Sequence, residues 1–513
     1  MKTTIFTKGL LLGSAFIFLL GFNSCRGGAG GAAIDGGSDN PGDFSIVRQG
    51  QAWLPLDQVL AYYGTSYDFD NDNVDTSNVV YGNTYPAGIR GKTIDPSIQL
   101  GGVQITDDIC SLATWIEYEA GGHAYGTLDI AVIWGQGPIT IIKLAQGMAA
   151  YPAITGHLTR GGDGQDRVVI DVVFEVQVVG QPVRQIWHVR LRQYAEGNLN
   201  IFNPQPPHRV DCNKTNYYGQ SLTPDVVYNA EWDRLDCVYT WLYGPDNDFY
   251  IYYSSSNGQS WTESVYPVSL DPDLWPQYPK LDIGRAAIFG GNPYVVGVVW
   301  TQNKSLTEQI PNVYLTGWES LADPDPSYEY STGLYIPVPP GDAYIEQGSI
   351  NPFIDISPPE SQGTNLMHIV WSQATVSCFD VFYVNTHNID DIIAGTDDWD
   401  YYNVGNDSYF ETWAEVVAFA DTSCTGKIVY ISTEGCPGAD GKIWTADFDF
   451  TDPSSVVING QSSLPDPGNA PDKSSYWYSP SMSLCYPNTL RAAWPDKRTT
   501  FQRHKIYGNY FTP

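Results

Sequence analysis

Short hydrophobic runs, each bounded by turn-forming residues, recur along residues 96–513 of the chain. Each repeat opens with a Pro-x-aliphatic tripeptide, and a β-branched run ending in an aromatic residue follows 14 to 22 residues later. A third run comes next, and glycine, proline, asparagine and aspartate separate the runs. This pattern predicts antiparallel strands joined by hairpins, with inward and outward side chains alternating along the first strand.

The repeats start near residues 96, 152, 224, 279, 352, 414 and 480, which are 55 to 73 residues apart. Six open with proline and the seventh with alanine: Pro96-Ser97-Ile98, Pro152-Ala153-Ile154, Pro224-Asp225-Val226, Pro279-Lys280-Leu281, Pro352-Phe353-Ile354, Ala414-Glu415-Val416 and Pro480-Ser481-Met482. Repeated strand units of this size predict an all-β fold, a seven-bladed β-propeller. We expect each proline to be the first residue of an innermost strand, where its missing N–H costs no ladder hydrogen bond. The second-strand aromatic residues should fill the space between sheets.

The last repeat ends near Phe511 after only three strands, and an uncovered strand edge invites aggregation. Residues 44–95 lie outside the repeats and contain strand-like pieces such as Phe44-Ser45-Ile46-Val47. We expect one such piece to add the outer strand and close the ring, so that residues 44–513 form a single propeller. The alternative is that residues 44–95 form a separate cap or loop.

The first 25 residues predict a secretory signal, with lysines at Lys2 and Lys8 followed by the apolar run Gly9–Phe22. Asn23-Ser24-Cys25 resembles a bacterial lipobox, which predicts lipidation of Cys25; ordinary cleavage nearby is the alternative. Residues 26–43 are rich in glycine and predict a flexible tether. We therefore expect an exported cell-envelope protein, anchored at the outer membrane or cell surface through its N-terminal lipid alone.

Composition narrows the classes of partner. The 57 acidic and 26 basic residues give a formal net charge of −31, which disfavours nucleic-acid and anionic-lipid partners. We expect a monomer whose partner is a protein or a glycan. Among the cysteines, the pairs Cys212/Cys237 and Cys424/Cys436 are close enough in sequence to form disulfides in an oxidising compartment.

The segment Ser254-Ser255-Ser256-Asn257-Gly258-Gln259-Ser260-Trp261 resembles the Asp-box (BNR) hairpin of the sialidase-like β-propellers, although the defining aspartate is Ser256 here. The resemblance implies a hairpin between outer strands, with a tight turn at Gly258 and Trp261 packed into the sheet. In that family the box is structural. The arginine triad, Tyr–Glu pair and acid aspartate of a sialidase are not identified in the chain, and the nearest text to the Arg-Ile-Pro motif is Gly88-Ile89-Arg90-Gly91.

Two sets of charged residues are candidates for a site in a central funnel. Asp282 and Asp355 occupy equivalent positions of neighbouring repeats and are the candidate catalytic carboxylates. The candidate binding residues, on inner strands or on one face, are Asp225, Lys280, Glu415, Arg160 and Arg285. The alternative for all of them is that they border a water-filled channel or lie in solvent.

One acidic run has the oxygen-rich spacing that calcium prefers. Asp68, Asp70 and Asp72 are candidate calcium ligands, but the run lacks the glycine and glutamate of an EF-hand, and a solvated loop is the alternative. We expect no other cofactor, because the cysteines and histidines show no zinc-ligand spacing and no P-loop is present.

The sequence favours a non-catalytic propeller that binds a protein or glycan. The alternative is a carbohydrate-active hydrolase or lyase that uses funnel carboxylates, and a cofactor-dependent oxidoreductase is a third possibility. High aromatic content, 14%, suits sugar stacking as well as core filling.

Overall fold

The computed structural model describes the strands and the better-placed turns of the chain. The described residues are 46–52, 67–68, 90–94, 110–117, 126–134, 139–160, 166–177, 184–193, 202–205, 207–211, 219–243, 248–257, 260–263, 267–269, 271–286, 294–306, 310–320, 334–337, 348–356, 366–374, 379–405, 409–419, 423–434, 442–463, 481–485, 489–496 and 505–511. The predicted signal, tether and Cys25 lie outside them. No helix in these ranges is long and apolar enough to cross a membrane.

The described part folds into antiparallel sheets. Four of them are meanders, in which four strands follow one another in sequence order. One contains β11 (Gly219–Asn229), β12 (Arg234–Tyr243), β13 (Asp248–Ser256) and β14 (Trp261–Glu263). The next contains β15 (Gln277–Arg285), β16 (Tyr294–Asn303), β17 (Pro311–Glu319) and β18 (Leu334–Ile336). Two more contain β19 (Ser349–Ile356), β20 (Met367–Ala374), β21 (Phe379–Asn385) and β22 (Tyr402–Asn403), and β23 (Tyr409–Ala418), β24 (Thr425–Glu434), β25 (Lys442–Asp449) and β26 (Val457–Ser463).

A larger sheet of nine strands precedes these four. It contains β1 (Ile46–Ala52), β3 (Arg90–Ile94), β4 (Cys110–Glu117), β5 (Gly126–Trp134), β6 (Ile139–Arg160), β7 (Asp166–Gln177), β8 (Arg184–Gln193), β9 (Phe202–Pro204) and β10 (His208–Arg209). The long strand β6 belongs to two units: residues 139–144 pair with β5 and β1, and residues 149–160 pair with β7. Two residues of β6 have a positive φ: Ala145, at 50°, lies between these stretches, and Tyr151, at 46°, lies within the second.

The last sheet joins the two ends of the described chain. Its order is β2–β29–β28–β27, with β2 (Tyr67–Asp68) beside β29 (Lys505–Phe511), then β28 (Thr489–Asp496) and β27 (Ser481–Cys485). Tyr67 pairs with Gly508, and Asp68 pairs with Tyr507. A short strand from the N-terminal part of the chain therefore pairs with the last strand of the final repeat.

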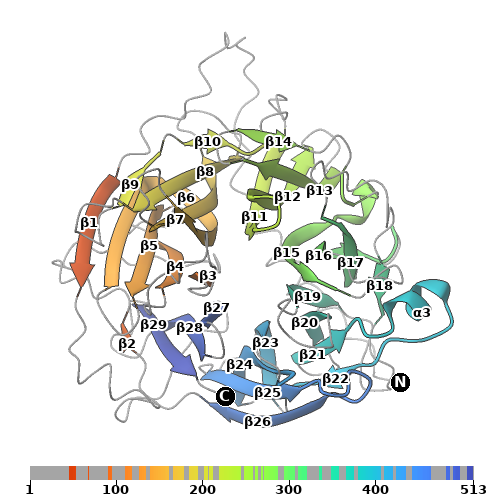
Figure 1. Cartoon of the computed structure of the whole chain (residues 1–513). Helices are drawn as coiled ribbons and strands as arrows, with labels where there is room; N and C mark the ends of the chain where they lie inside the picture. Colours follow the sequence, from red (N-terminus) through yellow and green to blue (C-terminus); the bar gives the residue numbers. More distant parts are fainter. Residues whose placement is uncertain are drawn as a thin grey trace, which may run out of the picture.

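The sheets stand around a common centre, as Figure 1 shows, which is the arrangement of a β-propeller. The first strands follow one another around this centre, because β6 contacts β11 and contacts continue through β15, β19, β23 and β27 to β3. One short helix, α3 (Ile389–Ala394), lies outside the sheets between β21 and β22 and ends at Gly395, whose φ is 70°.

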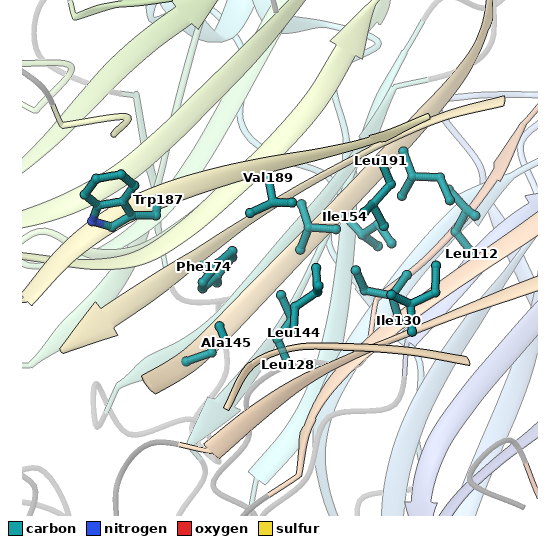
Figure 2. Packing of buried hydrophobic residues seen from close by; sticks show 14 of the residues in the cluster. Leu112, Leu128, Ile130, Leu144, Ala145, Ile154, Phe174, Trp187, Val189 and Leu191 are labelled. Carbon is teal, nitrogen blue, oxygen red and sulfur yellow. The ribbon is translucent and has the colours of Figure 1, made fainter. Parts of the chain in front are cut away.

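Hydrophobic cores lie between neighbouring sheets, so the middle strands are buried on both faces and read as near-continuous apolar runs. Figure 2 shows the core between the two halves of the nine-stranded sheet, where Leu128 of β5, Leu144 and Ile154 of β6, and Phe174 of β7 come together. Of the predicted second-strand aromatic residues, Phe174, Trp300, Trp371 and Tyr430 are at most 1% exposed. These rings fill the space between sheets, as expected.

Four of the prolines that open the repeats lie inside the first strands, which corrects the prediction that each would begin one: Pro152, Pro224, Pro279 and Pro352. Pro480 lies outside the described residues. The residue just before the repeat start has a positive φ, between 46° and 55°, in five consecutive repeats: Tyr151, Thr223, Tyr278, Asn351 and Trp413. The strand register shifts at each of these places. The motif is therefore a β-bulge, whose extra residue leaves the ladder and makes the missing proline N–H harmless. The predicted strand start at Pro96 lies outside the described residues.

The cysteines correct a second prediction. Cys237 is a buried free thiol whose Sγ lies 3.7 Å from the carbonyl oxygen of Val238, so the Cys212/Cys237 disulfide is not formed. Burial raises the pKa of this thiol well above its usual value, so it stays uncharged. Cys436 lies outside the described residues, and its pairing with Cys424 stays a prediction.

Candidate functional site at the bulged end of the inner strands

Two candidate carboxylates from the sequence tie neighbouring first strands together. Oδ2 of Asp282 accepts a hydrogen bond of 2.7 Å from the backbone N–H of Ile356 in β19. Oδ2 of Asp355 accepts one of 2.9 Å from Ala418 in β23. Thr155 of β6 holds the matching position and accepts from the N–H of Tyr228 in β11 at 3.1 Å. The equivalence predicted for Asp282 and Asp355 therefore corresponds to a repeated contact between neighbouring strands.

Asp225 and Glu415 make a second version of this contact, one position after the repeat start. Oδ2 of Asp225 accepts from the N–H of Leu281 at 3.0 Å, and Oε2 of Glu415 accepts from the N–H of Met482 at 2.8 Å. Both acids are buried, and a buried carboxylate needs such partners. These side chains hold one sheet against the next.

The remaining charged candidates do not gather at one point. Lys280 is half-buried on β15, and Arg285 is exposed at the end of the same strand. Arg160 ends β6 and pairs in register with Asp166. Arg160 and Arg285 are thus at corresponding ends of their strands, next to the turns that lead into the second strands.

The calcium candidates are only partly within the described residues. The backbone of Asp68 pairs with Tyr507, whereas Asp70 and Asp72 lie outside. Among the described side chains, no group of three or more histidine, cysteine, aspartate or glutamate residues could hold a metal ion. The calcium site stays a prediction.

The opposite end of the sheets holds an acid that the sequence analysis did not select. We call this the bulged end: the first strands begin there, the second strands end there, and the third strands begin there. Glu175 lies near the end of β7, pairs with Ala150 just before the β6 bulge, and is 0% exposed. Its Oε1 accepts a hydrogen bond of 2.8 Å from the N–H of Thr223, the bulge residue of β11.

The second carboxylate oxygen of Glu175 makes no hydrogen bond in the described part. Nη1 of Arg184, at the start of β8, lies 3.7 Å from this Oε2. Burial raises the pKa of Glu175 from 4.5 to about 7, although Arg184 and the Thr223 N–H act in the opposite direction. Glu175 therefore exchanges its proton near neutral pH, as a general acid or base must.

Tyr278, on the inner strand β15, is close enough to Glu175 to be influenced by its charge. It is the bulge residue of β15, with φ 55°, and it is half-buried. Burial, and then the negative charge of Glu175, raise the pKa of the Tyr278 phenol to about 12. A strained backbone position beside a buried acid is typical of functional sites.

Aromatic side chains surround the bulged end of the β11–β14 sheet. Trp241 of β12 lies 5.4 Å from Tyr243 and 5.6 Å from Tyr250, measured between ring centroids, and Tyr250 lies 6.1 Å from Tyr252. All four rings are half-buried. Gly219 allows this packing, because a Cβ there would fall 2.4 Å from Nε1 of Trp241.

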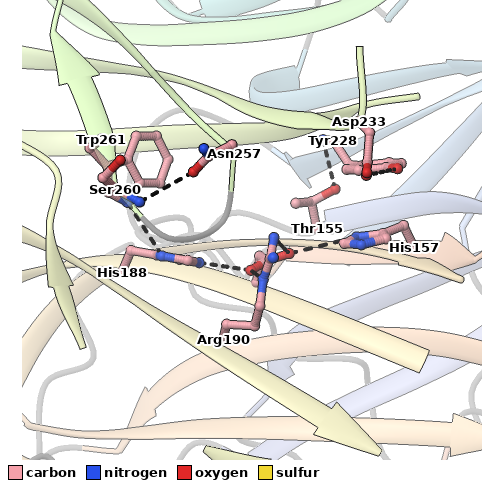
Figure 3. Close-up of polar contacts among 10 residues, drawn as sticks. Thr155, His157, His188, Arg190, Tyr228, Asp233, Asn257, Ser260 and Trp261 are labelled. Carbon is pink, nitrogen blue, oxygen red and sulfur yellow. Dashed lines mark hydrogen bonds and ion pairs between the residues drawn. The ribbon is translucent and has the colours of Figure 1, made fainter. Parts of the chain in front are cut away.

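A separate buried network, centred on Asp171 of β7, ties the nine-stranded sheet to the Asp-box hairpin (Figure 3). Asp171 binds Nε2 of His188 at 2.7 Å and Nε of Arg190 at 2.6 Å. The ring of His157 stacks on Tyr228 at 3.9 Å, and burial lowers the pKa of His157 to about 4. Every charge in this network is paired inside the protein, which is the pattern of a structural group.

The hairpin itself lies where the Asp-box resemblance implies. Residues 257–260 connect β13 to β14, the two outer strands of their sheet, and Ser256 pairs with Trp261. The N–H of Ser260 donates to Oδ1 of Asn257 at 3.3 Å across the turn. Trp261 is 7% exposed and packs into the sheet.

No protein-family model matches the chain, and no curated protein matches it. Solved structures similar to it include a protein of unknown function from Dyadobacter fermentans, with 9% identity, a TM-score of 0.39, and coverage of 85% of this chain and 97% of that one. An α-L-arabinofuranosidase from Fusarium graminearum has 10% identity, a TM-score of 0.41, and coverage of 88% and 98%. A mutant Trypanosoma rangeli sialidase with trans-sialidase activity has 9% identity, a TM-score of 0.39, and coverage of 91% and 59%. Most of the similar structures are glycoside hydrolases or sialidases, but likeness at this level assigns no family.

Proposed function

We propose first that the sheets form seven blades in a closed ring. The supporting observations are that β6 serves two blades in turn, that the seven first strands contact one another in a cycle, and that Tyr67–Asp68 pairs with β29. Deleting residues 44–89 should then expose the edge of β29 and cause aggregation. A deletion variant that stays monomeric and melts like the full chain would refute closure.

We propose that the protein is carbohydrate-active and that Tyr278 and Glu175 carry its chemistry. The observation on which this rests is the buried Glu175, with one oxygen lacking a hydrogen bond, whose charge acts on the half-buried Tyr278 of an inner strand. Most glycosidases use two carboxylates, but a tyrosine nucleophile replaces one of them in sialidases. A Tyr–Glu pair therefore suits attack on a glycoside.

The chemistry runs in two steps. Glu175 takes the phenolic proton while the Tyr278 oxygen bonds to the anomeric carbon, the glycosidic bond breaks, and the departing oxygen takes a proton from solvent. Water then attacks the anomeric carbon, Tyr278 leaves and recovers its proton from Glu175, and the water releases a proton to solvent. Glu175 is fully buried, so in this scheme it acts on the phenol and need not touch the sugar. Arg184 supports its ionised form.

Turnover measurements on a panel of chromogenic glycosides and polysaccharides test this proposal. Glu175→Gln and Tyr278→Phe should each lower the rate by about 100-fold or more, the usual effect of losing a base or nucleophile. The double variant Asp282→Ala/Asp355→Ala, at the other end of the strands, serves as the matched control and should stay active. Turnover that survives Glu175→Gln would exclude this assignment.

A non-catalytic glycan or protein binder is the second candidate function. It is favoured because the inner-strand acids Asp225, Asp282, Asp355 and Glu415 all hold neighbouring backbone groups, as described above. Glycan-array binding without turnover on any substrate, unchanged in Glu175→Gln, would favour this candidate. We further propose that the protein is exported, monomeric and lipidated at Cys25. Labelling cells with palmitate tests the anchor: the wild type should incorporate the label and Cys25→Ser should not. Incorporation that Cys25→Ser fails to abolish would contradict lipidation at Cys25.

A further inference from the structure

An exposed tryptophan stands at the bulged end, beside the strand that carries Tyr278. Trp275 is 44% exposed and directly follows the 3-10 turn η3 (Pro272–Leu274). Only two residues separate it from Tyr278, so the two Cα atoms lie within about 10 Å of each other. A short oligosaccharide can span this distance.

The backbone holds Trp275 in a conformation that tryptophan rarely adopts. Its φ and ψ are 56° and 57°, in the left-handed region, which is unfavourable for a residue with a Cβ. The N–H of Trp275 donates to the carbonyl oxygen of Pro272 at 3.2 Å. Strain of this kind persists where the surroundings impose it, and it often marks a binding site.

The surroundings support one edge of the indole and leave much of it in solvent. Phe249 of β13 lies 6.1 Å from Trp275 between ring centroids, with the planes at 46°. Phe249 packs in turn with Leu222 and Leu242 in a small apolar cluster of the same sheet. The indole N–H of Trp275 makes no hydrogen bond to any described residue, whereas the other exposed tryptophan, Trp232, donates its indole N–H to the carbonyl oxygen of Ser320 at 2.9 Å.

The charges near Trp275 restrict the ligand. Asp271 precedes the η3 turn and Asp273 lies within it, and both are exposed. Together with a net charge of −31, they repel an anionic polymer and accept hydrogen bonds from hydroxyl groups. An exposed aromatic face beside carboxylates suits a neutral sugar ring, whose C–H face packs on the indole and whose hydroxyls reach the acids.

We propose that Trp275 is a stacking subsite for a neutral glycan chain whose next units extend toward Tyr278. This inference rests on the proposed function, and it assigns the substrate class and the direction of the bound chain. Trp275 binds and orients the glycan in this scheme, and it takes no part in proton transfer.

Binding measurements in the Glu175→Gln background test the subsite without consuming the probe. Calorimetric titration uses the neutral hexasaccharides of glucose, mannose, xylose and arabinose, with polygalacturonate as the anionic comparison. Adding Trp275→Ala should weaken binding of the neutral probe by about tenfold or more, the effect of truncating an aromatic anchor, and Trp275→Phe should retain part of the affinity. Trp232→Ala, in the turn between β11 and β12 at the end of their sheet away from the bulges, is the matched control and should leave the affinity unchanged.

Results of two kinds would overturn the subsite. One is an affinity in Trp275→Ala within about twofold of its parent while the melting temperature is unchanged. The other is the absence of binding by every neutral probe, or tighter binding of polygalacturonate than of any neutral probe. Failure of the proposed function would look different. Turnover that survives Glu175→Gln would exclude Glu175 from the chemistry, whereas the dependence of glycan affinity on Trp275 would remain.

Discussion

The indole N–H of Trp261 donates to Nδ1 of His188 across a distance of 3.3 Å, and the two rings meet edge to face at 5.3 Å. Because Nδ1 accepts, the proton of a neutral His188 ring is on Nε2, where it donates to Asp171. The tryptophan of the Asp-box hairpin thus sets the tautomer of a histidine in the neighbouring sheet.

Trp261→Phe should remove this donor and leave a buried histidine nitrogen without its partner. We expect the free energy of unfolding to fall by about 1–3 kcal/mol, mainly from the unsatisfied group and the smaller ring. Denaturant titration followed by circular dichroism measures the loss. Trp232→Phe, which removes an exposed indole N–H donor, is the control and should cost less; equal losses would refute a special role for Trp261.

Asp282→Ala and Asp355→Ala should each lower the free energy of unfolding by about 1 kcal/mol. Each substitution removes the carboxylate that accepts a hydrogen bond from one backbone N–H of the neighbouring strand. The loss is modest because both carboxylates are only half-buried. Hydrogen exchange should become faster at Ile356 in the first variant and at Ala418 in the second. Glu319→Ala, an exposed acid on β17, is the control. Exchange rates that stay at the wild-type level would contradict the role assigned to these carboxylates.

Glu175 should make stability and activity depend on pH in opposite directions. Its folded pKa of about 7 exceeds the ordinary 4.5, so the native state binds more protons than the unfolded state between these values, and stability falls as pH rises from 4.5 to 7. Glu175→Gln should therefore gain stability relative to wild type across this window, by about 3 kcal/mol at pH 8, with little difference at pH 4. Thermal unfolding of both proteins from pH 4 to 8 measures this difference, and a flat difference would be inconsistent with the buried acid.

The wild-type rate should rise over the same range, because the ionised form of Glu175 is the one that takes the Tyr278 proton. A pH–rate profile that falls between pH 6 and 8 would instead indicate that the protonated form acts.

Asp171→Asn should be more damaging than any of these changes, since it leaves Arg190 buried beside His188 without a countercharge. A loss of about 3 kcal/mol is expected from breaking a buried ion pair. Burial raises the Asp171 pKa, but His188 and Arg190 outweigh it and lower the pKa from 3.8 to about 2. The stability it contributes is thus present above pH 3.8 and disappears as the pH falls toward 2, which acid titration of wild type and variant should show.

Local patterns predicted the strands well, because each strand is a short apolar run bounded by turn residues. The bulges escaped prediction for a physical reason: Tyr278 and Trp413 occupy left-handed positions where glycine is the residue expected, so nothing in their identity indicates a bulge. The prolines that follow mark the right places but were assigned to the wrong position within the strand.

The polar residues were harder to assign, because their partners are distant in sequence. Asp282 occupies a polar position in the polar–apolar alternation of its strand, as a funnel-facing residue would. Its carboxylate nevertheless accepts a hydrogen bond from the backbone of Ile356, 74 positions away. Glu175 had a usable signal, since it interrupts the apolar run of β7, a strand buried on both faces, where an acid is rare. Its effect on Tyr278 depends on the ring of sheets, which no local pattern reveals.

The 22-residue strand β6 has a consequence for how this protein could evolve. Since one unbroken segment serves as the last strand of one unit and the first of the next, neither unit can be duplicated, excised or exchanged by recombination without cutting through a hydrogen-bonded strand. The remaining units share no strand with one another in the described part of the chain and could be gained or lost one at a time. Lineages that vary in ring size should therefore change on the side away from β6.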